Sequence, residues 1–306
     1  MTTSNEQASV VQAIVRLKKK RNAVILAHNY QWGEVQDIAD FVGDSLELSQ
    51  QAARTTADVV VFCGVHFMAE TAAILCPDKT VLLPDEQAGC PMADMITAEQ
   101  LIQKKREFPQ ATVVCYVNTN AAVKAESDVC CTSANAVKVV QSLGDREILF
   151  IPDTYLGQYV ISQTGNQMVL WPGYCPTHVN IKPEDISRLR QQYPEANVVV
   201  HPECTPEVIA LADHALSSGG MCRFARREDV SQLIVGTEIG LIHRLNKENP
   251  GKQFISVSEH AICPTMKLIT LEKILRSLEA MSPRVSIPET VRRQAKAAVD
   301  RMLEIV

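Results

Sequence analysis

Three cysteines that each precede a proline recur at nearly constant spacing along the chain. They are Cys90, Cys175 and Cys263, and the gaps between them are 85 and 88 residues. Thiolates are the ligands that iron–sulfur clusters take from proteins. Three of them without a fourth at the same step suggest a 4Fe–4S cluster with one open iron, which can act as a Lewis acid. A structural zinc site fits poorly, because it usually takes four ligands that are closely paired in sequence.

The other seven cysteines are expected to be buried side chains of the core. No Cys-x-x-Cys pair occurs, which disfavours zinc ribbons and thioredoxin-like sites. Free cysteine is among the residue types that are most often buried, and we apply this interpretation to Cys63, Cys115 and Cys130 among others. Cys76 also precedes a proline but has no counterpart at the repeat step. The dipeptide alone therefore does not identify a ligand.

Polar residues that end apolar runs keep the same spacing as the cysteines. One position of the repeat holds His28, Tyr116 and His201, and a second holds Tyr30, Asn118 and Glu203. Another histidine, His178, lies three residues after Cys175. Histidine in such places favours substrate binding or proton transfer, and a glutamate beside it is a candidate general base.

A third repeated feature is a serine five residues after an aspartate. The pairs are Asp40 and Ser45, Asp128 and Ser133, and Asp213 and Ser218. Each serine precedes an amphipathic stretch, so we expect it to be the N-cap of a helix. Helix N-termini carry free N–H groups and a partial positive charge, and three of them at one cavity would hold a substrate with several carboxylates or a phosphate.

Strands that alternate with helices position these residues. Short Val- and Ile-rich runs predict buried parallel strands. We expect strands at 23–30, 59–62 and 81–83, at 112–118, 147–151 and 168–170, and at 197–203, 233–235 and 254–257. Helices are predicted after the three cysteines, at 98–107, 183–192 and 271–279. This pattern predicts three homologous three-layer α/β/α domains with parallel sheets.

The predicted domains are 1–108 with an N-terminal helix, 109–193, and 194–306 with a C-terminal helix. Ligands of open α/β sheets bind beyond the carboxyl ends of the strands. Three such units about a pseudo-threefold axis would therefore point their polar strand ends at one central cavity. Stability alone, as in solenoid repeats, is the simpler alternative, but solenoid repeats are shorter.

Composition excludes several classes of function. The chain has 306 residues, of which 46% are hydrophobic and 21% charged, as in ordinary globular proteins. Its net charge of -5 argues against nucleic acid as a partner. No apolar run reaches membrane-spanning length and the N-terminus does not resemble a signal peptide, so we expect a cytoplasmic protein without a membrane partner.

Together these residues resemble the quinolinate synthase family, the iron–sulfur enzymes of NAD biosynthesis. The resemblance covers nearly the whole chain. The matching segments are AHNYQ (27–31), GDS (43–45), CYVNT (115–119), PGYCPTH (172–178), HPEC (201–204), GTE (236–238), CPTMK (263–267) and ITLEK (269–273). One departure is Ser217-Ser218, where the family often has Ser-Thr, so that the hydroxyl is kept and a methyl group is lost.

The resemblance implies three similar domains around a pseudo-threefold axis and a 4Fe–4S cluster held by Cys90, Cys175 and Cys263. It implies a transferase that condenses iminosuccinate with dihydroxyacetone phosphate and releases phosphate and water. The residues that it places at the substrate are His28, Tyr30, Ser45, Tyr116, Asn118, Ser133, His178, His201, Glu203 and Ser218. We assign proton transfers to Glu203 and Tyr30, and orientation to Tyr116 and His201.

Two other functions remain open from the sequence. One is another three-cysteine 4Fe–4S hydro-lyase of the aconitase kind, which an assay for quinolinate would separate from the first. The other is an iron–sulfur sensor without turnover, for which no effector surface such as a basic helix is evident. Because iminosuccinate hydrolyses readily, direct handover from an L-aspartate oxidase is a further hypothesis.

Overall fold

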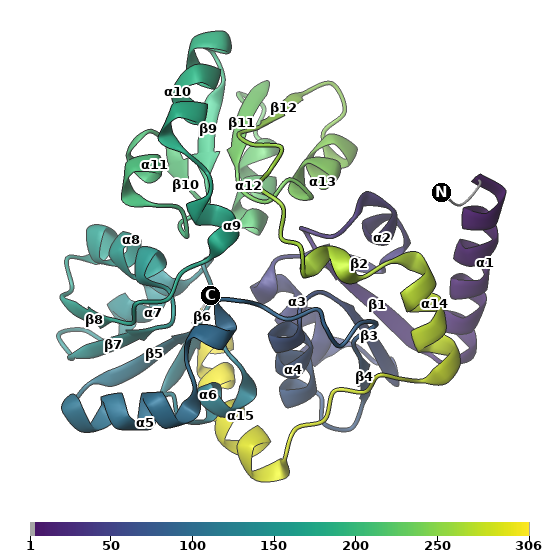
Figure 1. Cartoon of the computed structure of the whole chain (residues 1–306), viewed down its shortest axis with the longest axis horizontal. Coiled ribbons are helices and arrows are strands. Elements are labelled where there is room, and N and C mark those ends of the chain that lie inside the picture. Colours follow the sequence, from purple (N-terminus) through teal and green to yellow (C-terminus); the bar gives the residue numbers. More distant parts are fainter. Residues whose placement is uncertain (1–3, 306) are drawn as a thin grey trace.

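The computed structural model describes residues 4–305 and contains three parallel sheets of four strands (Figure 1). The first, in the order β2-β1-β3-β4, is formed by β1 (Ala23–His28), β2 (Phe41–Gly43), β3 (Val59–Cys63) and β4 (Thr80–Leu82). The second, in the order β6-β5-β7-β8, is formed by β5 (Thr112–Tyr116), β6 (Val129–Cys131), β7 (Ile148–Ile151) and β8 (Met168–Leu170). The third, in the order β10-β9-β11-β12, is formed by β9 (Asn197–Val200), β10 (His214–Ala215), β11 (Gln232–Gly236) and β12 (Gln253–Ser256).

The predicted class of α/β units with parallel sheets is confirmed. Figure 1 shows the three sheets in three lobes about a common centre, each flanked by helices. All nine predicted strands exist within a few residues of their expected bounds, because short apolar runs that contain β-branched residues are a local signal. The pseudo-threefold axis and the domain boundaries at 108 and 193 stay predictions.

One strand of each sheet was not predicted. β2, β6 and β10 are edge strands of two or three residues, and each directly follows an aspartate, a residue type that is depleted in strands. The aspartate before each of them has a structural role: Asp40, Asp128 and Asp213 accept the backbone N–H of Ile25, Val113 and Val198 at 2.8, 2.8 and 2.7 Å. The repeated aspartates therefore fasten the edge of each sheet to its neighbouring strand.

Helices cover the sheets, and those predicted at 98–107 and 183–192 have these bounds. They are α1 (Ser4–Lys20), α2 (Gly33–Ile38), α3 (Ser45–Arg54), α4 (His66–Leu75), α5 (Ala98–Glu107), α6 (Ala121–Ala125), α7 (Ala136–Ser142), α8 (Thr154–Thr164), α9 (Pro176–Val179), α10 (Pro183–Gln192), α11 (Pro206–Ala210), α12 (Ser218–Ala225), α13 (Leu241–Glu248), α14 (Leu271–Ala280) and α15 (Glu289–Glu304). Within residues 4–305, no helix combines the length and apolar character that crossing a membrane requires.

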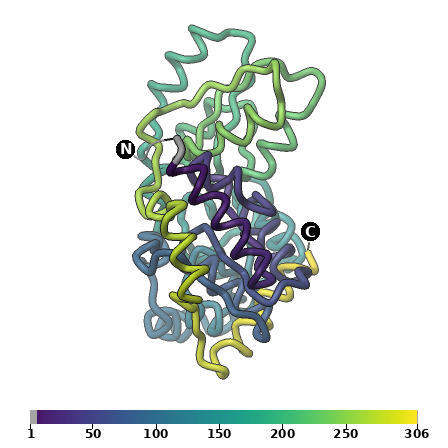
Figure 2. Tube along the Cα trace, turned by 90° about the vertical axis from the view of Figure 1, so that its right-hand side faces the viewer, coloured from purple at the N-terminus to yellow at the C-terminus, as the bar shows by residue number. Residues whose placement is uncertain are grey.

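The last two helices return to the first two sheets. α14 packs against α1 and β3, and Figure 2 shows α1 and α14 side by side. α15 packs against α6, β6 and α4. The chain thus closes on itself, because elements that follow the third sheet in sequence stabilise the first and second.

Candidate functional site

A cavity of about 70 Å³ lies where the carboxyl ends of strands from all three sheets meet. This is the position that strand topology favours for ligands in open α/β sheets. Every residue that the sequence placed in the site lines this one cavity. They are His28, Tyr30, Ser45, Cys90, Tyr116, Asn118, Ser133, Cys175, His178, His201, Glu203, Ser218 and Cys263. Their individual roles stay predictions.

Each cavity cysteine precedes a helical turn that its proline helps to form. The carbonyl of Cys90 accepts the N–H of Asp94 at 3.3 Å, and that of Cys175 accepts the N–H of Val179 at 3.0 Å. The carbonyl of Cys263 likewise accepts the N–H of the residue four positions later, at 3.3 Å. Proline suits the first position of such a turn, because its φ is already helical and no N–H is needed there.

The other seven cysteines are buried and free of disulfides, as predicted. Cys76, the fourth cysteine before a proline, ends α4 and donates its S–H to the carbonyl of Ala72 at 2.7 Å. It does not line the cavity. The structure therefore separates three half-buried cysteines at the cavity from seven core cysteines, which is the division that the repeat predicted.

The predicted N-caps were wrong by one to two residues. Asp44 caps α3, and its Oδ1 accepts the N–H groups of Leu46 and Glu47 at 3.1 and 3.0 Å. Ser217 caps α12, and Asn135 precedes α7. A carboxylate offers more acceptor capacity than a hydroxyl, which explains the choice at α3. The consequence is that Ser45, Ser133 and Ser218 do not serve as caps and lie at the cavity instead.

Glu203 lies at the centre of a buried polar cluster. Its Oε1 accepts a hydrogen bond from the phenol of Tyr116, and its Oε2 lies 2.6 Å from Nδ1 of His178. The ring of His201 stacks on that of His178 with centroids 4.4 Å apart. Nε2 of His201 lies 3.1 Å from the hydroxyl of Ser133. The second sheet thus supplies partners for a carboxylate of the third.

Burial sets the protonation of this cluster. Burial lowers the pKa of His28 and of His201 to about 3, so both rings are neutral at pH 7. Burial opposes ionisation of Glu203, but His201, His178 and the Tyr116 phenol outweigh it and lower its pKa to about 2. Burial, and then the charge of Glu203, raises the pKa of Tyr116 well above its usual value. The site therefore combines an ionised carboxylate with a protonated phenol.

Thr237 connects a second phenol to this cluster. Its hydroxyl lies 2.6 Å from the hydroxyl of Tyr30 and 2.8 Å from Nε2 of His178. Because Nδ1 of His178 faces the carboxylate of Glu203, that nitrogen carries a proton. Nε2 on the other side of the ring faces the Thr237 hydroxyl, which also faces that of Tyr30. Burial, and then Glu203, raises the pKa of the Tyr30 phenol well above its usual value.

Two donor sets at the cavity could hold a metal. Cys175, His178 and Glu203 offer ligand atoms that all lie within 4.8 Å of one another. The second set is the cavity cysteines Cys90, Cys175 and Cys263, all of which line the same space. Burial raises the pKa of the Cys90 thiol to about 12, with the neighbouring Cys263 contributing, so thiolate ligation there would release a proton. Within residues 4–305 these three are the thiols that line the cavity, and three sulfur donors fit a cluster with one open iron.

Several lining residues were missed by sequence reasoning. They are Asp44, Val65, Phe67, Met68, Thr177, Glu238 and Met266. Asp44 had a signal, because the residue before each repeated serine is a capping type. Glu238 had a weaker one, since it lies two residues after the end of β11. The apolar members had none, because an apolar residue beyond a strand is ordinary core sequence.

The cavity lining contains no Lys or Arg among the residues that the structure describes. Two helices begin at the cavity, α3 at Ser45 and α12 at Ser218, although Asp44 already accepts two N–H groups of α3. In addition, Oδ1 of Asn118 is buried and has no hydrogen-bond partner within residues 4–305. A buried acceptor of this kind is ready for a donor on a ligand.

Comparison with known proteins gives a consistent result. A family model described as Quinolinate synthetase A protein matches residues 12–304. A protein named Quinolinate synthase from Dehalococcoides mccartyi is 62% identical over 292 residues, which cover 95% of this chain and 97% of that relative. A protein of the same name from Methanosarcina barkeri is 56% identical over 98% of this chain and 99% of its own length. Another, from Geobacter metallireducens, is 56% identical over 97% of this chain and 98% of its own length.

Proposed function

Because the chain belongs to the family of quinolinate synthetase A proteins, we propose that it is an enzyme that condenses iminosuccinate with dihydroxyacetone phosphate to form quinolinate, phosphate and water. The observation that carries the proposal is the meeting of all the predicted site residues in one cavity. The reaction makes a pyridine ring, and NAD biosynthesis is the process that it would serve. An enzyme of this kind is a transferase.

The hydroxyl donors of the site suit substrates that are anions. Iminosuccinate carries two carboxylates and the triose a phosphate. Because the described part of the chain brings no Lys or Arg to the lining, the hydroxyls of Ser45, Ser133 and Ser218 would bind these groups, with help from those N–H groups of α3 and α12 that Asp44 and Ser217 do not occupy. Asn118 would add an acceptor through its unpartnered Oδ1.

Proton transfers would use the buried cluster. Glu203 is ionised and can accept a proton, while the phenols of Tyr30 and Tyr116 are protonated and can donate one. His201, fixed against Ser133, and Tyr116, bound to Glu203, would orient the substrate. Removal of water during ring closure needs both a donor and an acceptor, and the cavity places them within one hydrogen-bonded cluster.

Cys90, Cys175 and Cys263 would hold a 4Fe–4S cluster at this cavity. When bound, such a cluster supplies a Lewis acid through the iron that no cysteine holds. The alternative set of Cys175, His178 and Glu203 would hold a single ion. The cluster would need Cys90 and Cys263, whereas the single ion would need His178 and Glu203.

The test of the activity is an anaerobic assay of the iron-reconstituted chain. Iminosuccinate is generated in place from oxaloacetate and ammonium, dihydroxyacetone phosphate is added, and quinolinate is measured by chromatography. We expect quinolinate to form, and to fall at least about a hundredfold in Glu203→Gln, because a transferred proton loses its acceptor. Lack of quinolinate from the unsubstituted chain would contradict the proposal. Adding an L-aspartate oxidase with aspartate instead tests direct handover.

The test of the cofactor is a count of iron and sulfide per chain. We expect about four of each in the unsubstituted chain, and loss of most of both in Cys90→Ser and Cys263→Ser. Cys76→Ser is the matched control, since this buried thiol also precedes a proline, and it should keep the full count. Retention of metal in Cys90→Ser together with its loss in His178→Asn would favour the single-ion set.

A further inference from the structure

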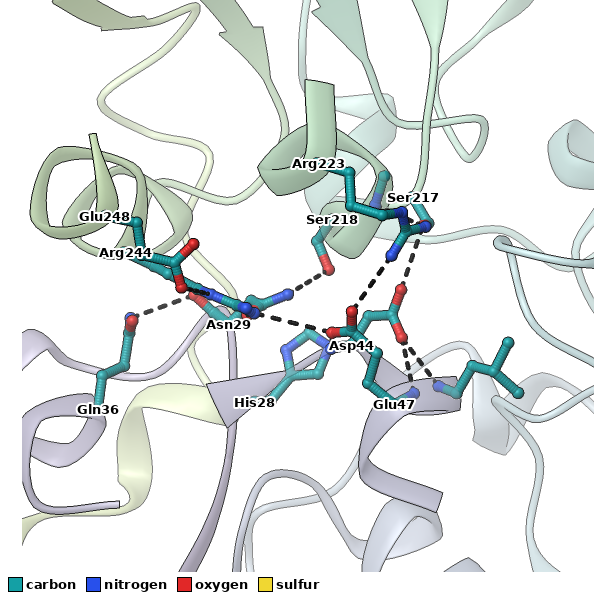
Figure 3. A network of polar contacts seen from close by, with 12 residues as sticks. His28, Asn29, Gln36, Asp44, Glu47, Ser217, Ser218, Arg223, Arg244 and Glu248 are labelled. Atoms are coloured by element: carbon teal, nitrogen blue, oxygen red, sulfur yellow. Dashed lines mark hydrogen bonds and ion pairs between the residues drawn. The ribbon is translucent and has the colours of Figure 1, made fainter. Parts of the chain in front are cut away.

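A buried polar network joins the first sheet to the third beside the cavity (Figure 3). Asn29, which follows β1, is fully buried, and the side chain of Arg244 on α13 is 12% exposed. In Figure 3 the side chain of Ser218 points from the start of α12 toward Asn29. Nδ2 of Asn29 lies 2.9 Å from the Ser218 hydroxyl, and Arg244 reaches Oδ1 of Asn29 at 2.6 Å.

The guanidinium settles which way the amide of Asn29 points. Arg244 has only donors, so the atom of Asn29 that faces it must be the oxygen. The amide nitrogen must then face Ser218, and an amide nitrogen can only donate. Ser218 is therefore an acceptor in this contact, and its single hydroxyl proton is left for another partner.

The hydroxyl of the neighbouring Ser217 both accepts and donates a hydrogen bond within the protein. The hydroxyl of Ser217 accepts the N–H of Gly220 at 3.1 Å and donates its proton to Oδ2 of Asp44, also at 3.1 Å. Its proton is thus used within the protein. Of two adjacent hydroxyls, only that of Ser218 keeps a proton for the cavity, which it lines.

The network holds these partners in place. Nε of Arg244 donates to Glu248 at 2.6 Å, one helical turn further along α13. Nε2 of Gln36 lies 3.2 Å from the carbonyl of Asn29 and 2.9 Å from that of Gly240, so the backbone beside Asn29 is fastened as well. Little freedom remains for the Asn29 amide to turn over.

We propose that Arg244 and Asn29 are positioning residues that make Ser218 a hydrogen-bond donor to an anionic group of the substrate in the cavity. The group is a carboxylate or a phosphate, both of which accept such a bond strongly. This inference deepens the proposed function and rests on it for the identity of the substrates. It assigns roles to two residues that do not line the cavity themselves.

Asn29→Asp is the variant that tests the polarity. Aspartate has nearly the same shape and keeps its contact with Arg244, but it replaces the donor that faces Ser218 with an acceptor. Ser218 must then donate to it, and the cavity loses its proton. We expect the KM of one substrate to rise about tenfold or more with a smaller change in kcat, as for the loss of a hydrogen bond to a charged group. A rise for the triose identifies a phosphate, and a rise for iminosuccinate a carboxylate.

A double-mutant cycle with Ser218→Ala separates hydroxyl polarity from added charge. If Asn29 acts through the hydroxyl, Asn29→Asp has little further effect in the Ser218→Ala background, and Ser218→Thr retains near-normal KM. Equal effects in both backgrounds would overturn the proposal. Arg223→Gln is the matched control: Arg223 is an exposed arginine of the same network and binds Glu47 at 3.2 Å, so its loss should leave KM unchanged.

Equilibrium binding keeps the test independent of turnover. The same cycle is measured by calorimetry with quinolinate as a dicarboxylate probe and with inorganic phosphate, on the reconstituted chain. A non-additive cycle for either probe supports the inference even if no quinolinate is synthesised, in which case only the proposed function fails. Additive cycles, or no binding of either probe, overturn the inference even if the enzyme is active.

Discussion

Two of the seams between the sheets differ in chemistry. α15 lies along α6, β6 and α4, and buries a stripe of apolar residues made up of Ala295, Ala298, Val299 and Met302. The seam between the first and third sheets instead buries Asn29, Asp44, Ser217 and Ser218 beside Arg244. Apolar burial stabilises without direction, whereas each hydrogen bond has a donor and an acceptor. The polar seam lies beside the cavity, where direction matters.

The apolar seam should carry the larger share of stability. Met302 is fully buried, and Met302→Ala removes apolar contact without easy collapse around it. We expect the free energy of unfolding to fall by about 2–5 kcal/mol, measured by urea denaturation. Arg293→Ala, at a position whose side chain is 69% exposed on the same helix, is the control. A loss below about 1 kcal/mol from Met302→Ala would remove the contrast between the seams.

A methyl group inserted into the polar seam should have a smaller effect that is local. A Cβ on Gly219 would lie 2.5 Å from Oδ2 of Asp44, so Gly219→Ala must displace either the Asp44 side chain, which caps α3, or the start of α12. We expect about 1–3 kcal/mol of destabilisation, with faster hydrogen exchange at the starts of these two helices and little change in α15. At Gly89 the nearest atom would be 3.9 Å away, so Gly89→Ala should be close to neutral. Equal effects of the two substitutions would contradict the close approach.

The exposed margin of the polar seam should contribute least. The side chain of Arg223 is 58% exposed where it meets Glu47 at 3.2 Å. Such pairs are screened by water and salt, so Arg223→Gln should cost no more than about 0.5 kcal/mol in urea denaturation. A loss of more than about 1 kcal/mol, or a clear rise in KM, would mean that the exposed Arg223 is coupled to the buried residues of the polar seam.

Much of the architecture could be predicted because its signals are local. The strands that begin at Ala23, Thr112 and Asn197 follow from Val- and Ile-rich runs, and α5 and α10 from amphipathic periodicity. The edge strands β2, β6 and β10 were not predicted, because each has at most three residues and directly follows an aspartate. The caps shifted because Asp44 and Ser217 compete with the serines that follow them for the same N–H groups.

The candidate site likewise contains residues that the sequence could identify and residues that it could not. The threefold spacing selected Cys90, Cys175 and Cys263 and rejected Cys76, and the predicted site residues in register with them line the cavity, whereas the repeated aspartates do not. The spacing did not reveal Thr237, which connects Tyr30 to His178 from a strand end that no repeat position marked. Thr237 contacts both Tyr30 and His178 only because folding brings the three side chains together, and the spacing of residues in the sequence does not show this.

The sequence by itself determined which chemical groups the protein brings to its cavity: three thiols, three serine hydroxyls, and a set of histidines, tyrosines and a glutamate at strand ends. Only the tertiary structure decided how those groups are used. The direction of the Ser218 hydroxyl depends on Asn29, which lies 189 residues away, and on Arg244, which faces Asn29 from another sheet. The physical reason is that side-chain type and local period are written in neighbouring residues, whereas the direction of a hydrogen bond depends on partners that only folding brings together.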